Sequence, residues 1–321
     1  MSKCLYCYKE IVDDNLNYHP SCAYKLFGRR KAPILEYTRD NIESLALKVL
    51  ENNTALTGVQ PKLSLEINRG GKNEPDKMTI VGLWGNYILK PQSNVYRSMP
   101  ENEDLTMKLA EASGIRTVNH GLIRMGDGEI AYITKRADRG EHGEKYSMLD
   151  MCQLTNRLTE HKYMGTYKQI AETIKIHSSA SMLDVQKFWE IIIFSWITGN
   201  SDMHCKNFSL ISKDNLSYQL APAYDLLAVV LTGINDPDEL AMPLDASGVK
   251  SDTISGLDRS SFSGAMTASG ISPRIAERII DKMMSHKEKW FEIIGTSFLD
   301  ADLQAQYKDL IIRRLSKLSA R

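Results

Sequence analysis

The pattern of apolar and polar residues divides the chain into a strand-rich first part and a helical second part. Up to about residue 137, apolar or alternating runs bounded by turn residues predict β-strands. The expected strands are 63–67, 78–81, 84–89, 121–124 and 130–133. Beyond about residue 147, apolar residues recur at the spacing of one helix face. The expected helices are 148–158, 167–178, 185–198, 276–294 and 303–318.

Further elements interrupt these two regions. Apolar residues three and four positions apart predict short helices over 41–50 and 101–113. The runs 208–211 and 218–220 predict a β-hairpin inside the helical part. Residues 232–256 are expected to be rich in loops.

The change from strands to helices near residue 138 predicts an α+β fold with two lobes. We expect a strand-rich N-lobe over 29–137, with a Gly-containing loop, and a helical C-lobe over 138–321. The first 28 residues are expected to form a separate small unit. Two lobes joined by one short linker commonly form a cleft for a ligand.

Composition narrows the class of protein. The 321 residues are 42% hydrophobic and 25% charged, as in globular domains, and Lys+Arg and Asp+Glu are both 40. A formal net charge of zero argues against direct nucleic-acid binding, although Lys25, Arg29, Arg30 and Lys31 form a local basic cluster. No apolar run is long enough to span a membrane, and the N-terminus lacks the core of a signal peptide. Five cysteines without a secretion signal indicate a cytoplasmic protein.

The N-terminal segment contains a candidate zinc site. Cys4 and Cys7 form a Cys-x2-Cys pair, and His19 and Cys22 form a His-x2-Cys pair after a short loop. Two close ligand pairs across a loop suit tetrahedral Zn²⁺. Three of the five cysteines fall in this pattern, so we expect structural zinc. The alternative is incidental thiols and a surface histidine in a mobile terminus.

A polar loop at 199–207 follows the almost wholly apolar run 188–197. A run that is apolar on every side is usually buried, and a polar loop on such a scaffold is a typical place for chemistry. The loop contains Asp202, His204 and Asn207, and the hairpin that follows ends just before Asp225. The hairpin is expected to bring these side chains into one site.

These residue types suit metal-dependent phosphoryl transfer, which needs Mg²⁺, a lysine on the phosphates and a group that orients the attacking hydroxyl. Asn207 and Asp225 offer the oxygen ligands that Mg²⁺ prefers. Asp202 is a suitable base, and its Asp-x4-Asn spacing to Asn207 is that of the protein-kinase catalytic loop. Lys90, at the end of an apolar strand, is the candidate for holding phosphates. By itself each residue has an ordinary explanation, such as a turn cap or a strand-end lysine.

Three other features have more than one interpretation. The loop containing Gly58, Gln60 and Lys62 precedes a strand and could cover phosphates, or it is an ordinary polar turn. Glu101 and Glu103 begin a helix, where they either favour its dipole or pair with Lys90. His204 has no second histidine nearby for a metal centre, so we expect it to order the loop or contact the nucleotide.

Taken together, these segments resemble the HipA family of toxin Ser/Thr kinases. The matching motifs are Gly58-Val59-Gln60-Pro61-Lys62, Ile88-Leu89-Lys90-Pro91, Glu101-Asn102-Glu103, Asn200 to Asn207 and Ala221 to Leu226. They occur in the family's order from about residue 50 onward. The chain also resembles the short HipT branch, because it lacks room for the extra N-terminal subdomain of full HipA.

The resemblance implies a bilobal protein-kinase-like fold that uses ATP and Mg²⁺. Carried over to this sequence, Lys90 would hold phosphates, Asp202 would be the base, and Asn207 and Asp225 would bind Mg²⁺. The Gly-containing loop, His204 and the hinge would contact the nucleotide. The loop and hinge residues that carry this role are Gly58, Val59, Gln60, Lys62, Lys135 and Ala137.

The resemblance also implies regulation and partners. Family members phosphorylate their own Gly-containing loop, and here Thr57 is the first candidate, with Thr54 and Ser64 behind it. The expected partners are a small HipS-like protein and a DNA-binding HipB-like antitoxin. An aminoacyl-tRNA synthetase is the expected type of protein substrate. The competing interpretations are a small-molecule kinase on the same scaffold and a non-catalytic binding module.

Overall fold

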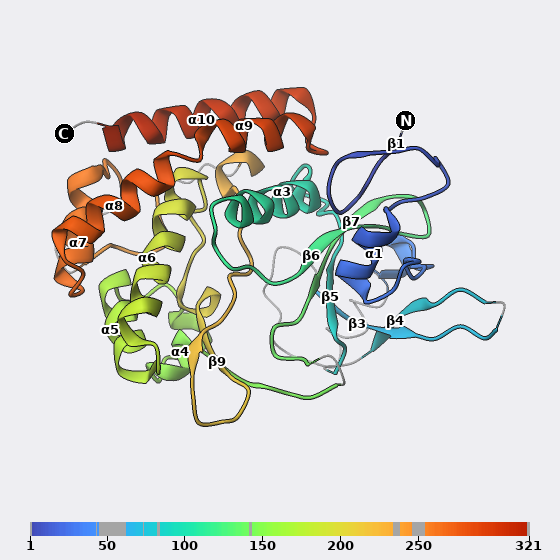
Figure 1. The fold of residues 1–321 in the computed structure, drawn as a ribbon, viewed down its shortest axis with the longest axis horizontal. Coiled ribbons are helices and arrows are strands. Elements are labelled where there is room, and N and C mark those ends of the chain that lie inside the picture. Colours follow the sequence, from blue (N-terminus) through green and yellow to red (C-terminus); the bar gives the residue numbers. More distant parts are fainter. Residues whose placement is uncertain are drawn as a thin grey trace. The chain divides into compact units, whose positions relative to one another are not determined.

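The computed structural model describes residues 2–42, 44, 62–72, 74–81, 84–140, 143–233, 238–245 and 254–319. The chain forms two compact units (Figure 1). The first contains Met1–Asp104, Val118–Arg139 and Thr296–Phe298. The second contains Leu105–Thr117, Gly140–Gly295 and Leu299–Arg321. The expected helix over 41–50 and the loop around Gly58 lie largely outside the described residues.

The first unit is built on a five-stranded antiparallel sheet in the order β4-β3-β5-β7-β6. Its strands are β3 (Leu63–Asn68), β4 (Lys77–Val81), β5 (Tyr87–Lys90), β6 (His120–Arg124) and β7 (Ile130–Lys135). All five expected strands are therefore present. The third begins at Tyr87 rather than residue 84, because Trp84 is 71% exposed and Gly85 donates to the Ser64 hydroxyl instead of a ladder.

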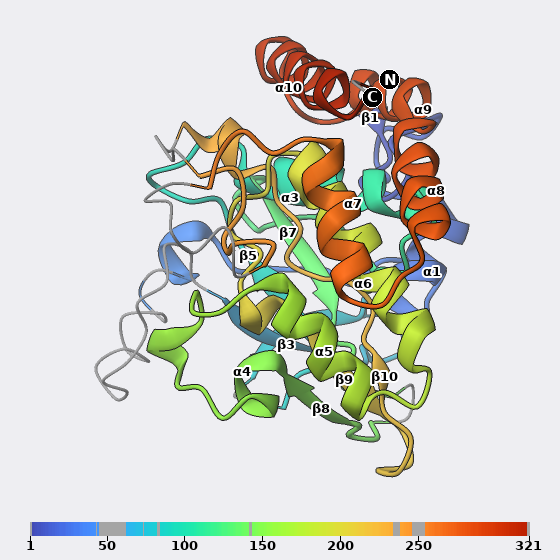
Figure 2. The same cartoon turned by 90° about the vertical axis from the view of Figure 1, so that its left-hand side faces the viewer.

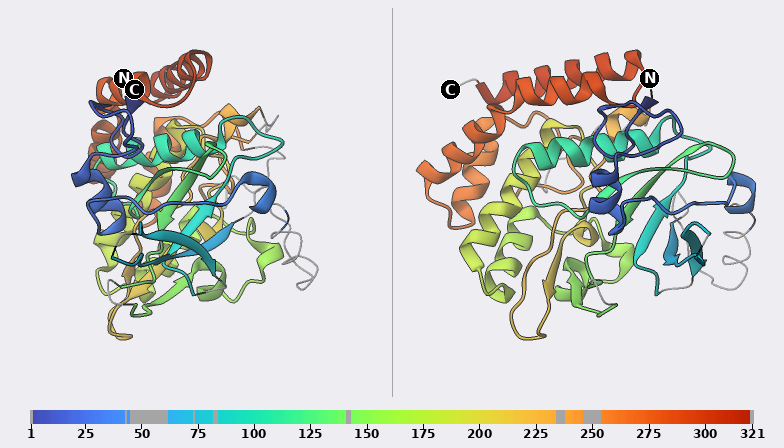
Figure 3. Two further views of the ribbon diagram at one scale, coloured as in Figure 1. Left: turned by 90° about the vertical axis from the view of Figure 1, so that its right-hand side faces the viewer. Right: turned by 45° about the vertical axis from the view of Figure 1, so that its right-hand side comes forward.

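The N-terminal segment packs on the β6 edge of this sheet. It forms a two-stranded hairpin, β1 (Ser2–Lys3) with β2 (Glu10–Ile11), followed by helix α1 (Pro20–Phe27) (Figure 3). Pro20 opens the helix and Gly28 closes it in the left-handed conformation, a common combination at helix ends. The Leu122 N–H donates to the Leu5 carbonyl, and the Tyr18 hydroxyl donates 2.5 Å to the Leu122 carbonyl.

Helix α3 (Met99–Ala112) matches the helix expected over 101–113. Its residues up to Asp104 belong to the first unit and those from Leu105 to the second. Three consecutive polar residues on it are nearly fully buried, Asn102, Glu103 and Asp104. Buried carboxylates are costly unless they are paired, so this turn of the helix must have strong partners.

The second unit is mainly helical and contains α6 (Ser181–Ile197) among its helices (Figure 2). Most residues of α6 are buried. Helices α5, α8 and α10 and strand β10 contact α6. The other helices are α4 (Met151–Leu154), α5 (Tyr167–His177), α7 (Arg259–Ala268), α8 (Pro273–Met284), α9 (Lys287–Thr296) and α10 (Ala301–Ser319). Single 3-10 turns occur at Thr159–His161, Cys205–Asn207 and Val229–Thr232.

A small three-stranded sheet of this unit contains the two strands that follow the loop at 199–207. Strands β9 (Ser209–Ser212) and β10 (Gln219–Leu220) form the expected hairpin, and β8 (Ser147–Asp150) pairs with the other side of β9. The helix expected over 148–158 is therefore wrong at both ends, because its first residues belong to β8 and α4 ends at Leu154. Its apolar spacing fits either structure, and pairing of β8 with β9 decides for a strand. Asp150 then caps the short α4 with a capping box.

The helix expected over 276–294 is two helices, α8 and α9, which meet at Ser285-His286. The Ser285 hydroxyl donates 2.7 Å to the Lys282 carbonyl, and its side chain thereby competes with the regular helical bonds. Helix α10 confirms the last expected helix. Among the described residues, no helix is long and apolar enough to cross a membrane.

Candidate functional site

The loop that carries Asp202 begins where the buried helix α6 ends. Gly199 has a φ of +74°, and a Cβ at this position would lie 2.6 Å from a Leu310 methyl group. Both the backbone conformation and the available space therefore require glycine. The Asn200 N–H donates to the Ser195 carbonyl, and the Asn200 side-chain oxygen accepts from the Asp202 N–H at 3.1 Å. These two hydrogen bonds fix the direction in which the loop leaves the end of α6.

Asp202 presents a half-exposed carboxylate that is held from one side. The Tyr163 hydroxyl donates to its Oδ1 at 2.6 Å, and His204 Nε2 lies 4.0 Å from the same oxygen. The Asp202 side chain is 50% exposed. A positioned carboxylate open to solvent is suited to accept a proton from an approaching hydroxyl. Tyr163 is not predicted from the sequence, because it lies 39 residues before Asp202 and no local pattern connects the two.

His204 is buried beside this carboxylate, with the Tyr163 ring edge-on against it. Burial lowers the pKa of His204 below its ordinary value, and Lys162 adds to this, while Asp202 and Asp225 oppose it. The imidazole is therefore neutral at pH 7. Its Nδ1 is buried without a hydrogen-bond partner among the described residues. Such an atom marks a place for water or a ligand, because buried polar groups are usually paired.

Asn207 and Asp225 supply the oxygen donors that the sequence predicts for Mg²⁺. The Asn207 side-chain nitrogen donates 2.9 Å to the Asp202 carbonyl, so the amide oxygen remains for a cation. Asp225 has a φ of +60°, an uncommon conformation for a residue other than glycine and one that clusters at functional sites. The Tyr224 hydroxyl contacts the Lys206 carbonyl and Ser209 Oγ, tying this segment to the loop. Hard oxygen donors of this kind fit Mg²⁺.

In the first unit, Lys90 and Glu103 form a buried ion pair. Lys90 Nζ lies 2.5 Å from Glu103 Oε1, and the two side chains are 6% and 3% exposed. The ammonium also lies 5.5 Å from the centre of the Tyr132 ring. Glu103, one of the two acids at the start of α3, therefore pairs with Lys90.

The other predicted nucleotide-contacting residues are placed as follows. Lys62 is exposed just before β3, Lys135 ends β7, and Ala137 follows it half-buried. The Ser64 hydroxyl, a candidate for phosphorylation, accepts from the Gly85 N–H at 3.0 Å. The remaining candidates lie outside the described residues, namely Gly58, Val59, Gln60, Thr57 and Thr54.

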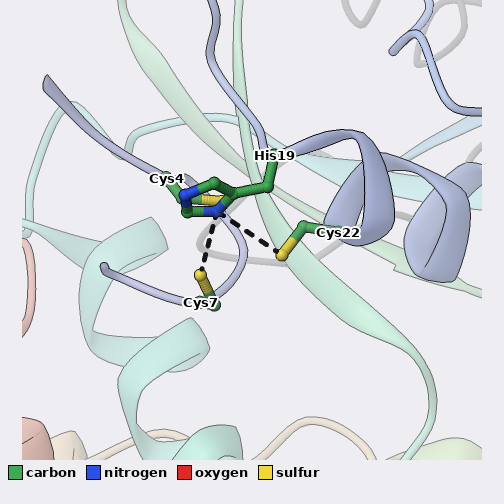
Figure 4. A group of neighbouring side chains, drawn as sticks. All are labelled: Cys4, Cys7, His19 and Cys22. Carbon is green, nitrogen blue, oxygen red and sulfur yellow. Dashed lines mark hydrogen bonds between the residues drawn. The ribbon is translucent and has the colours of Figure 1, made fainter. Parts of the chain in front are cut away.

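The four predicted zinc ligands come together at the start of the chain (Figure 4). Their ligand atoms, from Cys4, Cys7, His19 and Cys22, all lie within 4.8 Å of one another. Tetrahedral Zn²⁺ with bonds of about 2.3 Å separates its sulfur ligands by about 3.8 Å, so this spacing fits the ion. His19 Nδ1 faces the Cys7 and Cys22 sulfurs at 3.4 and 3.8 Å.

The hydrogen bond on the other side of the His19 ring also fits a metal ligand. Nε2 lies 3.0 Å from the Glu10 carbonyl, so it carries the proton and leaves the Nδ1 lone pair for the metal. Burial, with the neighbouring Cys4 and Cys7 thiols, raises the pKa of Cys22 to about 12. This cluster could therefore hold a metal ion, and a bound cation would stabilise its thiolates.

Comparison with known proteins connects these features to a family. A family model described as the HipA-like C-terminal domain matches residues 54–291. The chain is 35% identical over 191 residues to a Sinorhizobium fredii protein named "Putative kinase Y4dM", a match that covers 55% of this chain and 45% of that protein. It is 26% identical over 209 residues to the serine/threonine-protein kinase toxin HipA of Shewanella oneidensis, covering 60% and 46% of the two chains. The chain thus spans about half the length of the curated relatives it matches.

Solved structures share the fold. The HipA chain in the Shewanella oneidensis complex of HipA, HipB and operator DNA matches with a TM-score of 0.65 and 20% identity. That match covers 90% of this chain and 74% of the other. The Helicobacter pylori proinflammatory kinase CtkA matches with a TM-score of 0.55 and 16% identity, covering 80% and 96%. The expected α+β kinase-like fold, with a strand-rich N-lobe and a helical C-lobe, is confirmed.

Proposed function

Because this chain belongs to the family of HipA-like C-terminal domains, we propose that it is an ATP-dependent serine/threonine protein kinase and the toxin of a toxin–antitoxin system. The observation that carries the proposal is the loop after α6. There Asn207 is bonded to the Asp202 backbone while the Asp202 carboxylate stays half-exposed and is oriented by Tyr163. The Lys90–Glu103 pair in the first unit adds the lysine that phosphoryl transfer needs.

The chain's own residues then have distinct tasks. Asp202 orients a serine or threonine hydroxyl and accepts its proton as the hydroxyl oxygen bonds to the γ-phosphorus. The bond between that phosphorus and the β–γ bridging oxygen breaks, and ADP leaves with the electron pair. Lys90 offsets phosphate charge, and Asn207 and Asp225 would hold Mg²⁺, which would supply positive charge to the phosphates. Lys135, Ala137 and the loop around Gly58 bind the nucleotide.

Regulation by self-modification is part of the same proposal. Transfer of phosphate to Thr57 would change the loop that covers the nucleotide, and Thr54 and Ser64 are secondary acceptors. Ser64 is engaged with the Gly85 N–H, which disfavours it as an acceptor. Phosphate mapping on the purified chain after incubation with MgATP tests this order. Exclusive labelling at Ser64 would contradict it.

Two partners and a protein substrate are part of the proposal. The Shewanella oneidensis HipA structure contains HipB and operator DNA. We therefore propose a HipB-like antitoxin, together with a small HipS-like protein, for this chain. A cytoplasmic aminoacyl-tRNA synthetase is the proposed protein substrate. Co-purification of the chain with the products of neighbouring genes, followed by mass spectrometry, tests the two partners directly.

We also propose that Cys4, Cys7, His19 and Cys22 bind structural Zn²⁺. Their spacing and the Glu10 carbonyl behind His19 support this assignment. Metal analysis of the purified chain should give about one zinc per chain, because structural sites hold the ion tightly. Less than about half an equivalent, with intact thiols, would count against the site.

The deciding experiment for the kinase is phosphoproteomics of cells expressing the chain, the Asp202→Asn variant or the Asp309→Asn variant. Asp309 is an exposed residue on α10, so its variant matches the charge change away from the site. We expect phosphorylated proteins with the wild type and Asp309→Asn, and a loss on the order of 10²-fold or more with Asp202→Asn. Phosphate on a small molecule and on no protein would show a small-molecule kinase. If the chain does not bind MgATP at all, the interpretation that remains is a non-catalytic binding module.

A further inference from the structure

The Cys/His segment, residues 2–28, contacts the same part of the first unit that holds Lys90 and Glu103. Its Leu5 carbonyl and Tyr18 hydroxyl bond to the backbone of Leu122 on β6. The packing is close enough that a Cβ on Gly121 would lie 2.9 Å from a Leu26 methyl group. The segment is therefore packed closely against the β6 edge of the sheet. His120 lies on the same strand.

Tyr8 connects the zinc ligands to helix α3. It directly follows Cys7, and its N–H donates 2.9 Å to the Cys4 carbonyl, closing the turn between the two cysteines. It has a φ of +63°, a genuine outlier for a bulky side chain. Its buried hydroxyl donates 2.6 Å to Asp104 Oδ2 on α3. Backbone strain of this kind persists only where the surrounding structure holds it in place. The strain at Tyr8 therefore indicates that its contact with Asp104 is a specific feature of the fold.

Asp104 is fully buried and also receives a second short bond. Its Oδ1 lies 2.6 Å from His120 Nδ1 on β6. The carboxylate thus has one oxygen toward Tyr8 and the other toward the sheet. The next residue toward the N-terminus is Glu103, the partner of Lys90. Fixing Asp104 therefore fixes the helix turn from which Glu103 extends.

Residues of the sheet also connect Asp104 to Lys90. The His120 ring stacks on Tyr132, with ring centres 6.0 Å apart, and the Lys90 ammonium lies 5.5 Å from the Tyr132 ring centre. Lys90, Glu103, Asp104, His120 and Tyr132 are consequently one continuous buried cluster. Tyr8 contacts this cluster from the Cys/His segment.

We propose that the Cys/His segment is a metal-dependent support for the Lys90–Glu103 pair, with Tyr8 as the positioning residue that transmits metal occupancy to α3. The inference rests on the proposed kinase function. Ligation of Cys4 and Cys7 fixes the turn that aims the Tyr8 hydroxyl. Loss of the metal releases Tyr8 from Asp104 and loosens Glu103. The expected ligand is Zn²⁺, given the three sulfurs and one imidazole.

Two tyrosines of the segment provide a matched test. Tyr8 and Tyr18 are both nearly buried and both donate a short hydrogen bond, Tyr8 to the Asp104 carboxylate and Tyr18 to the Leu122 carbonyl. The full-length Tyr8→Phe and Tyr18→Phe variants are compared for zinc content, melting temperature, MgATP affinity by calorimetry and hydrogen exchange at the start of α3. A third arm is wild-type protein treated with a zinc chelator and then resupplied with Zn²⁺.

We expect Tyr8→Phe to keep one zinc, to bind MgATP roughly tenfold more weakly and to exchange faster at the start of α3. Tyr18→Phe should retain the wild-type affinity and exchange in α3. Chelation of the wild type should reproduce the Tyr8→Phe result, and Zn²⁺ should reverse it. Equal behaviour of the two variants, or chelation without effect on α3, overturns the proposal.

The two proposals fail in different ways. If the wild type neither binds MgATP nor transfers phosphate, the kinase function is wrong, while zinc-dependent exchange in α3 still reports the coupling. If the wild type is an active kinase and α3 exchanges identically with and without zinc, only the support role is wrong. Should Tyr8→Phe fail to fold, the chelation arm on the wild type decides by itself.

Discussion

Asp202 gains its orientation from a residue on another segment, the Tyr163 hydroxyl 2.6 Å away. This bond holds one carboxylate oxygen in place and so fixes the rotamer of Asp202. His204 lies against Tyr163 edge to face and completes the support. The side chain expected to do the chemistry is therefore positioned by neighbours that the motif does not include.

The Tyr163→Phe variant measures this support. Removal of the hydroxyl costs about 1 kcal/mol at this partly exposed site, or roughly a fivefold loss of kcat. The KM for ATP should change little, because the hydroxyl contacts the Asp202 carboxylate. Tyr24→Phe, on an exposed residue of α1, is the control. An unchanged kcat would show that the bond has no catalytic role.

His204 should make stability depend on pH in a defined direction. Burial lowers its folded pKa below 6.5, so the unfolded chain takes up the proton first as the pH falls. The stability that this contributes is present above about 6.5 and is lost as the pH falls through the lowered folded value. Urea unfolding of the Mg²⁺-free chain should show a weaker acid dependence in His204→Gln. His177→Gln, on an exposed residue, should match the wild type.

At the scale of elements, local patterns predicted most of the structure. The alternating run at 63–67 and the hairpin over 121–133 form the strands their sequences favour, since turn residues and apolar alternation agree there. The segment Ser147–Asp150 is different, because its apolar residues fit both a helix and a strand. Only its pairing with β9, a long-range contact, decides between them.

The ion pairs of Glu239 should contribute strongly to the stability of the second unit. Its carboxylate contacts Arg314 at 2.6 Å, Lys317 at 2.8 Å and the Trp196 ring N–H at 2.9 Å, and it is 12% exposed. Removing one partner of a nearly buried pair costs about 3 kcal/mol. Glu239→Ala should therefore lower the free energy of unfolding by about that amount, measured by urea denaturation. Glu288→Ala, where the side chain is 84% exposed, should change it by less than about 0.5 kcal/mol.

Acid should weaken the same cluster. Burial opposes ionisation of Glu239, but hydrogen bonds from Lys317 and Trp196 and the charge of Arg314 hold its pKa below the ordinary value. Its stabilising contribution is therefore present above the unfolded value of 4.5 and is lost as the pH falls through the lowered folded value. A Glu239→Ala variant whose stability loss is the same at pH 7 and pH 3 would contradict this.

At the scale of the whole molecule, binding of the nucleotide should raise the stability of the folded chain. A ligand that binds only the folded chain stabilises it by about 2.7 kcal/mol at a hundredfold excess over its Kd. MgATP should therefore raise the melting temperature of the wild type, measured by calorimetry. Lys90→Met should abolish most of the shift, because it removes the phosphate-facing charge. Lys168→Met, on the surface of α5, should keep it. A full shift in Lys90→Met would exclude Lys90 from binding.

The sequence by itself determined the fold class, the candidate residues of both sites and the family resemblance. These depend on local spacing, such as Asp202 to Asn207 and Cys4 to Cys7, which the chain fixes covalently. Only the tertiary structure decided that Glu103 pairs with Lys90, that Tyr163 holds Asp202 and that Tyr8 reaches Asp104. The physical reason is that these bonds join segments far apart in sequence. Their energies depend on burial and geometry that no local pattern encodes.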